Sequence, residues 1–252
     1  MTNLSPWMQA LCWGLFAGAS LLFGSAIGYF VPLGKKIPSL VMAFGSGALL
    51  SSISFDLMPS AYKHGGILTT SIGFVVGGLI FTFSDFLLSH KGASHRKRSS
   101  DLQKSEAEHQ GSGLALAAGA LIDGIPESIV LGLGLIANNE ISIVTLFAVL
   151  ISNVPEALSS TVGMKKNGRT PVYIFSIWFF IILISGLSSL AGFTLLNDFS
   201  PEFISIITAL AAGSMLTMVA DTMIPEAYSE VNSKAGLAIL AGFLLTFYLG
   251  KL

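Results

Sequence analysis

Two glutamates lie directly after prolines in the middle of long apolar stretches, as Pro126-Glu127 and Pro155-Glu156. No lysine or arginine lies within ten residues of Glu127 or within eight of Glu156, so no sequence neighbour neutralises either carboxylate. A carboxylate in hydrocarbon costs about 2.5–3.5 kcal/mol on membrane-insertion scales. Two of them, each beside a helix-breaking proline, are therefore interpreted as a site for a cation.

The spacing around these glutamates adds further oxygen groups. Asp123 precedes Glu127 by four residues and Ser152 precedes Glu156 by four, which places each pair on one face of a helix. Two such helices facing each other, together with the Asn153 amide, would line a cation site at mid-membrane. We predict that the metal ligands are Asp123, Glu127, Ser152, Asn153 and Glu156. The alternative is that protonated glutamates hydrogen-bond and hold two helices together.

The composition identifies the surroundings of this site as a membrane. Hydrophobic residues make up 52% of the 252 residues and charged residues 11%, whereas soluble domains average about 25% charged residues. Long apolar runs without the alternation of a membrane barrel predict an all-α polytopic membrane protein. The single cysteine, Cys12, excludes a disulfide framework within the chain and a thiolate cluster for zinc. No common hydrolase or phosphate-binding motif indicates an enzyme, and no basic-aromatic pattern indicates a nucleic acid partner.

Apolar runs of about 20 residues predict eight transmembrane helices in one domain, 1–252. They lie near 8–30, 39–61, 67–89, 113–136, 140–164, 171–194, 203–228 and 234–251. The loops on one side then hold eleven of the thirteen lysines and arginines, and only Lys63 and Lys251 remain for the other side. The positive-inside rule therefore predicts that both termini are external.

The same rule makes the polar segment 90–112 a cytoplasmic loop. It contains His90, His95 and His109 among serines and charged residues. Three histidines without close spacing form a weak motif, so we favour a basic linker over a metal-scavenging loop.

An internal repeat is visible in the apolar sequence. Residues 47–62 align with 213–228, including Pro-x-Ala-Tyr at the same place, and residues 77–83 align with 241–247. Spans two and three thus resemble spans seven and eight. If spans one and six complete the two units, the arrangement is 3+2+3. Because each unit has an odd number of spans, the two units run through the membrane in opposite directions and form inverted repeats. Inverted repeats around a polar midplane site are typical of transporters.

Acidic residues elsewhere extend the predicted site into a path. Asp56 and Ser60 flank Pro59 near the external end of span two, and Asp221 and Glu226 flank Pro225 near the cytoplasmic end of span seven. We predict that these four residues line the transport path; the alternative is an ordinary helix-end role. His64 lies in a short external loop, where we expect it to be solvated.

At these residues the chain resembles the ZIP (Zrt/Irt-like) family of divalent metal transporters. Residues 123–128, Asp-Gly-Ile-Pro-Glu-Ser, match the family's HNxPEG-type motif in span four, and residues 152–157, Ser-Asn-Val-Pro-Glu-Ala, match its HExPHE-type motif in span five. The family's metal-binding histidines are replaced: Asp123 and Ser152 stand at histidine positions, and Gly124 stands at the asparagine. The resemblance implies one site of Asp123, Glu127, Ser152 and Glu156, and a second that shares both glutamates and keeps Asn153. It also implies a moving helix bundle and a homodimer.

Ligand chemistry suggests which ions such a site would take. An all-oxygen site suits Mn²⁺, Mg²⁺ or Ca²⁺, whereas imidazole suits Zn²⁺, and the preference of Fe²⁺ lies between these two groups. Carboxylates also bind Zn²⁺. We expect transport of divalent cations of the Zn²⁺, Mn²⁺ and Fe²⁺ class into the cytoplasm, with the ion bound as cargo and no cofactor. The expected location is the plasma membrane of a prokaryote. The alternatives are a metal sensor or non-transporting relative, and an intramembrane metallohydrolase with Glu127 as general base.

Overall fold

The computed structural model describes residues 4–34, 36–90, 112–138 and 140–251, and in these residues the regular structure is helical throughout. The prediction of an all-α protein is confirmed. The predicted loop 90–112, with His95 and His109, lies outside the described residues except at its two ends. The helical elements are α1 (Pro6–Phe30), α2 (Lys36–Ser52), η1 (Ile53–Leu57), α3 (Met58–Leu88), α4 (Ser112–Asn138), α5 (Ile143–Lys166), α6 (Pro171–Leu196), α7 (Pro201–Met218), η3 (Val219–Met223), α8 (Ile224–Val231) and α9 (Lys234–Leu249).

Several helix starts follow directly from local sequence. Pro6, Pro171 and Pro201 occupy the first turn of α1, α6 and α7, where a missing backbone donor costs nothing. The Thr170 and Ser200 side chains cap α6 and α7 by accepting hydrogen bonds from backbone amides of the first turn.

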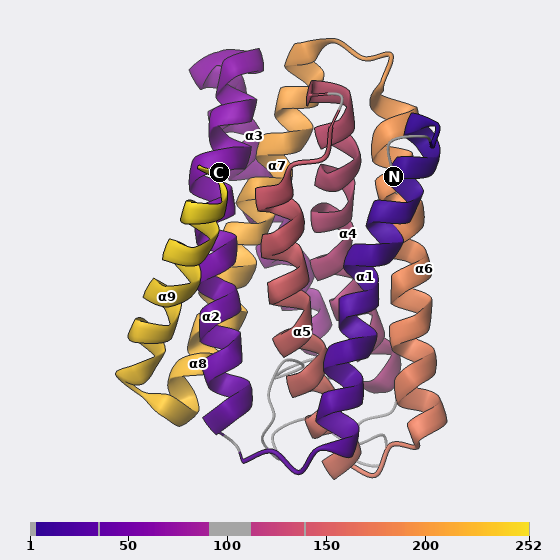
Figure 1. The fold of residues 1–252 in the computed structure, drawn as a ribbon, viewed down its shortest axis with the longest axis vertical. Helices are drawn as coiled ribbons and strands as arrows, with labels where there is room; N and C mark the ends of the chain where they lie inside the picture. Colours follow the sequence, from indigo (N-terminus) through magenta and orange to yellow (C-terminus); the bar gives the residue numbers. More distant parts are fainter. Residues whose placement is uncertain (1–3, 35, 91–111, 139, 252) are drawn as a thin grey trace.

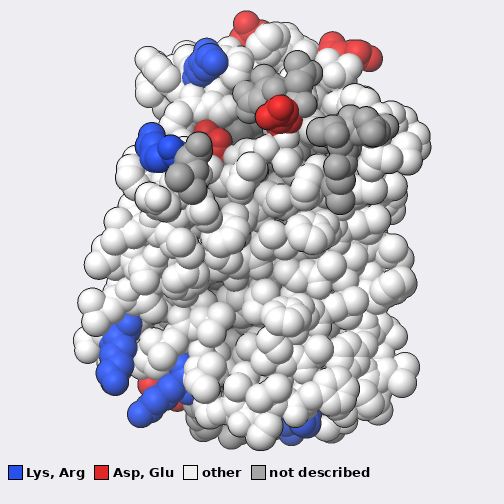
Figure 2. Space-filling view, viewed as in Figure 1, with Lys and Arg blue, Asp and Glu red and all other residues white. Residues whose placement is uncertain are grey.

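The helices form an elongated bundle suited to a membrane. Among the described residues, six helical stretches are long and apolar enough to cross one, and Lys234–Leu249 is a shorter apolar helix. In Figure 1, α1 begins and α9 ends toward the top of the bundle; this end is called the terminal end, and the other the opposite end. Charged side chains gather toward both ends of the visible face, with an uncharged band between them (Figure 2). The prediction of a polytopic membrane protein is supported by both features.

One of these stretches, Lys36–Leu88, changes direction at Gly66. This residue has φ 70° and ψ 179°, outside the helical region. Ser205 Oγ on α7 donates to the Ala61 carbonyl at 2.6 Å, and a methyl group at Gly73 would lie 2.6 Å from the carbonyl oxygen of the next residue, Ile206. Twelve residues of uninterrupted helix would separate Ala61 from Gly73 by about 18 Å. The chain therefore reverses at Gly66, where glycine permits the positive φ.

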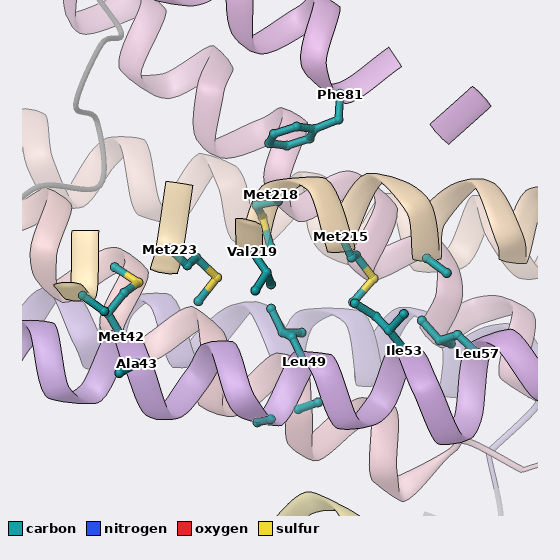
Figure 3. Packing of buried hydrophobic residues seen from close by; sticks show 14 of the residues in the cluster. Met42, Ala43, Leu49, Ile53, Leu57, Phe81, Met215, Met218, Val219 and Met223 are labelled. Atoms are coloured by element: carbon teal, nitrogen blue, oxygen red, sulfur yellow. The ribbon is translucent and has the colours of Figure 1, made fainter. Parts of the chain in front are cut away.

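The helices pack as two groups. Helices α1, α4, α5 and α6 pack mainly on one another, as do α2, α3, α7, α8 and α9, and the groups meet chiefly where α2 packs on α5 and α4 on α7. The second group contains most of the largest apolar cluster, in which Met42 and Leu49 of α2 pack near Met215, Met218 and Met223 (Figure 3). A second cluster around Trp178 joins α1, α5 and α6 in the first group.

A buried polar chain also ties the first group together. Trp178 Nε1 on α6 donates to Thr161 Oγ1 on α5 at 2.9 Å, and Thr161 Oγ1 donates to Ser25 Oγ on α1 at 2.9 Å. All three side chains are buried. Because a buried donor without an acceptor costs about 1–3 kcal/mol, the chain contributes to stability only while it is complete.

Thr161→Val is therefore expected to lower the free energy of unfolding by about 1–3 kcal/mol, because it leaves the Trp178 N–H without its acceptor. Thermal unfolding of the purified protein in detergent measures the effect. Thr194→Val is the matched control, since Thr194 is exposed and bonds only to the Leu190 carbonyl of its own helix. Equal melting temperatures for the two variants would contradict the assignment.

The aligned halves of the sequence share an unusual local structure. The π-helix η1, Ile53–Leu57, and the π-helix η3, Val219–Met223, occupy equivalent positions in the two aligned segments. Each π-helix is followed two residues later by a proline, Pro59 or Pro225, which removes a backbone donor from the helical ladder. Single π-turns inside helices occur frequently at functional sites, and here they carry Asp56 and Asp221.

Candidate metal site

Helices α4 and α5 carry all five predicted metal ligands, each near a proline inside the helix. Pro126 lies within α4 and Pro155 within α5. The five side chains are buried, and the most accessible of them, Asn153, is 6% exposed. Glu127 is 1% exposed and Glu156 is 4% exposed. The carboxylates therefore lie inside the protein and not against lipid.

Two of the predicted ligands use their donors on backbone carbonyls. Ser152 Oγ donates to the Val149 carbonyl of its own helix at 3.0 Å, and Asn153 Nδ2 donates to the Ala17 carbonyl of α1 at 3.0 Å. The serine hydroxyl and the asparagine amide both keep an oxygen that accepts hydrogen bonds or binds a cation. The bond to Ala17 fixes the Asn153 side chain toward α1.

Small residues bring neighbouring helices close to this part of α5. A methyl group at Gly24 of α1 would lie 2.2 Å from the Val154 carbonyl oxygen, and one at Gly45 of α2 would lie 3.1 Å from Ser152 Cα. On α4, a methyl group at Gly124 would lie 3.8 Å from Ser185 Oγ of α6. Ser152 thus lies where the two helix groups meet, and α5 is enclosed by a helix of each group.

The structure buries the predicted ligands but does not gather them into one cluster of charged ligands. Among the described residues, no group of three or more histidine, cysteine, aspartate and glutamate side chains lies close enough to hold a metal ion. Helices α4 and α5 touch each other little, since α4 packs mainly on α6 and α5 mainly on α1 and α2. The assignment of the five residues as metal ligands stays a prediction.

Asp56, predicted in the path, is held at the start of α5. Its Oδ2 accepts hydrogen bonds from Ser142 Oγ and Thr145 Oγ1. Ser142 also caps α5 by accepting from the Thr145 amide at 3.2 Å. Asp56 and Ser60 line a cavity of about 30 Å³. Neither hydroxyl partner was predicted from the sequence. Ser142 could have been recognised from the sequence as a residue that caps α5, but not as a partner of Asp56.

His64 differs from the sequence expectation. It lies within α3 and is half-buried, and its Nδ1 lies 2.9 Å from the Ser60 carbonyl oxygen. It also lines the cavity of Asp56 and Ser60. A side chain that we expected to be solvated in a loop is thus part of a structured pocket.

The other two predicted path residues differ in exposure. Asp221 on η3 is exposed, and Glu226 on α8 is buried at 3% exposure. Helix α8 lies at the opposite end of the bundle (Figure 1). The predicted path residues Asp56 and Glu226 therefore lie toward different ends, as a path through the bundle requires.

Apolar helices of membrane-spanning length around buried acidic residues define a polytopic membrane protein with a polar interior. The sequence profile of the ZIP zinc transporter family matches residues 88–250, which is more than half of the chain. The chain therefore belongs to the ZIP zinc transporter family, a family of membrane metal transporters and not of enzymes. The resemblance inferred from the two proline motifs is confirmed.

A relative in a plant extends the similarity beyond the residues of the profile. The chain is 24% identical over 223 residues to a protein of Arabidopsis thaliana named "Putative zinc transporter At3g08650". The aligned part is 86% of this chain and 34% of the relative. The chain thus spans about a third of the length of the curated relative that it matches.

Proposed function

We propose that this protein transports divalent metal cations of the Zn²⁺, Mn²⁺ and Fe²⁺ class across a membrane into the cytoplasm. The observation that carries the proposal is the burial of Asp123, Glu127 and Glu156 on α4 and α5, the helices through which the first group contacts the second, in a chain of the ZIP family. Buried carboxylates in a membrane are costly and favour a cation as their partner.

The grouping of the helices supports a transport mechanism by alternating access. The group α1, α4, α5 and α6 carries all five predicted ligands. The predicted path residues lie on α3 and α8 of the other group and on the π-helices η1 and η3 that continue α2 and α7. We propose that the first group moves against the second and exposes the site to each side in turn. Bringing α4 and α5 into the ligating arrangement is then part of ion binding.

The proposed topology has eight spans with both termini external. The reversal at Gly66 divides Lys36–Leu88 into two spans, and the repeated π-helices support two related units in a 3+2+3 arrangement. The terminal end then faces outward. The proposed assembly is a homodimer, and the proposed location is the plasma membrane of a prokaryotic cell.

The test is uptake into proteoliposomes that contain the purified protein, with Zn²⁺, Mn²⁺, Fe²⁺, Mg²⁺ and Ca²⁺ supplied separately. We expect saturable uptake of at least one ion of the first three, because carboxylate, hydroxyl and amide oxygens accept them all. Liposomes without protein provide the background. Saturable binding without uptake of any ion would refute transport and favour a metal sensor.

A further inference from the structure

Two cavities meet at His64 near the terminal end of the bundle. The first, of about 30 Å³, is lined by Asp56, Ser60 and His64 together with Ser142 and Thr145 of the α5 start. The second, of about 180 Å³, is lined by His64, Ile136, Pro201 and Ile204. His64 and Ile204 line both cavities. A cation that moves from the larger cavity toward Asp56 therefore passes the imidazole.

The hydrogen bond to Ser60 determines which ring nitrogen of His64 binds a cation. A carbonyl oxygen only accepts hydrogen bonds, so the Nδ1 that lies 2.9 Å from the Ser60 oxygen carries the proton. In the neutral imidazole, the lone pair is then on Nε2. Histidines that bind metals commonly donate their other ring N–H to a backbone carbonyl in this way. The local helix thus holds His64 in the tautomer of a metal ligand.

Asp56 is the charged residue that lines the first cavity together with His64. Ser60 and His64 are four residues apart and lie on one face of α3, and Asp56 comes four residues earlier, in η1. Both hydrogen bonds of the carboxylate reach Oδ2, from Ser142 and Thr145, and Oδ1 makes none with the residues that the structure describes. Eight residues of α-helix rise about 12 Å, so His64 and Asp56 occupy successive positions along the cavity that both line.

We propose that His64 is the first protein ligand of the incoming divalent cation, which then passes from Nε2 to the Asp56 carboxylate. This inference rests on the proposed function and adds a selective step to it. Imidazole binds Zn²⁺ and Fe²⁺ well, whereas Mg²⁺ and Ca²⁺ prefer oxygen. A histidine at the mouth therefore enriches imidazole-binding ions before they reach an interior site of oxygen ligands.

The first experiment measures uptake by His64→Gln in proteoliposomes. Glutamine retains a donor for the Ser60 carbonyl but lacks the Nε2 lone pair. We expect KM for Zn²⁺ to rise about tenfold with little change in the maximal rate, which is the lower end of the losses caused by changing even the outer-shell partners of a metal ligand. Lys63→Gln is the matched control, because Lys63 is an exposed neighbour that lines neither cavity. An unchanged KM in His64→Gln would overturn the proposal.

The second experiment detects the metal at His64 without transport. The chain has four histidines, so changing His90, His95 and His109 to glutamine, with a histidine-free purification tag, leaves His64 alone. Diethyl pyrocarbonate then labels its imidazole, and mass spectrometry measures the rate with and without Zn²⁺. We expect Zn²⁺ to slow labelling at least about fivefold, because the ion occupies the reactive Nε2. Equal labelling rates with and without Zn²⁺ would overturn the proposal that His64 binds the cation. If Zn²⁺ protects His64 but no ion is taken up into proteoliposomes, only transport is refuted.

Discussion

Metal uptake is expected to fall at least about a hundredfold in Glu127→Gln and in Glu156→Gln, because even changes to the outer-shell partners of a metal ligand cost up to about a hundredfold. Both carboxylates are almost completely buried on α4 and α5, the helices through which the first group contacts the second. Glutamine preserves the size and hydrogen-bonding capacity of the side chain but removes the negative charge that offsets the cation. Uptake of Zn²⁺ and Mn²⁺ into proteoliposomes measures the loss, and size-exclusion chromatography verifies that each variant is folded.

The matched control for these variants is Glu202→Gln. Glu202 is an exposed carboxylate in the first turn of α7, outside the predicted site and path. Its uptake should equal that of the unmodified protein. Full uptake by either Glu127→Gln or Glu156→Gln would contradict the assignment of the carboxylate site, and it would leave transport itself unaffected.

Gly47→Ala and Gly213→Ala are expected to be strongly destabilising. A methyl group at Gly47 of α2 would lie 1.9 Å from the Ile239 carbonyl oxygen of α9, and one at Gly213 of α7 would lie 1.9 Å from the Phe74 carbonyl oxygen of α3. Backbone atoms cannot rotate away as side chains do, so the helices must separate. Overpacking costs about 1–3 kcal/mol, and more where backbone has to move.

Thermal unfolding in detergent and the yield of monodisperse protein measure this effect. Gly236→Ala is the control, because a methyl group at this helical position meets no atom within 4 Å. That variant should be unchanged or slightly more stable, since alanine favours helix more than glycine does. Melting temperatures for Gly47→Ala and Gly213→Ala equal to that of Gly236→Ala would contradict the packing.

The class of fold was predictable because it depends on local properties of the chain. Length and hydropathy mark helices such as α1 and α6 within the sequence itself, and Pro6 and Pro171 mark where they begin. The π-helices were not predicted. A proline predicts the loss of one hydrogen bond, but whether the ladder kinks or widens depends on packing around it.

The candidate site was predictable in its chemistry and not in its contacts. Pro-Glu pairs in apolar runs indicated buried carboxylates, since a carboxylate in a membrane-spanning segment faces the protein interior and not lipid. The partners of Asp56 lie 86 and 89 residues away in sequence, and helical spacing carries no information about such distant contacts. His64 was misjudged for the same reason: its cavity is completed by residues of α4 and α7.

The close glycine contacts have a mechanical consequence. Methyl groups at Gly77 and Gly242 would also lie 1.9 and 2.0 Å from carbonyl oxygens, of Leu210 and Phe44. The backbone of α2 thus contacts that of α9, and the backbone of α3 contacts that of α7. Sliding of one helix along the other would bring carbonyl oxygens against Cα atoms, so we expect each pair to move as one rigid unit. Between α2 and α5, where a methyl group at Gly45 would still be 3.1 Å from Ser152 Cα, shear meets a lower barrier.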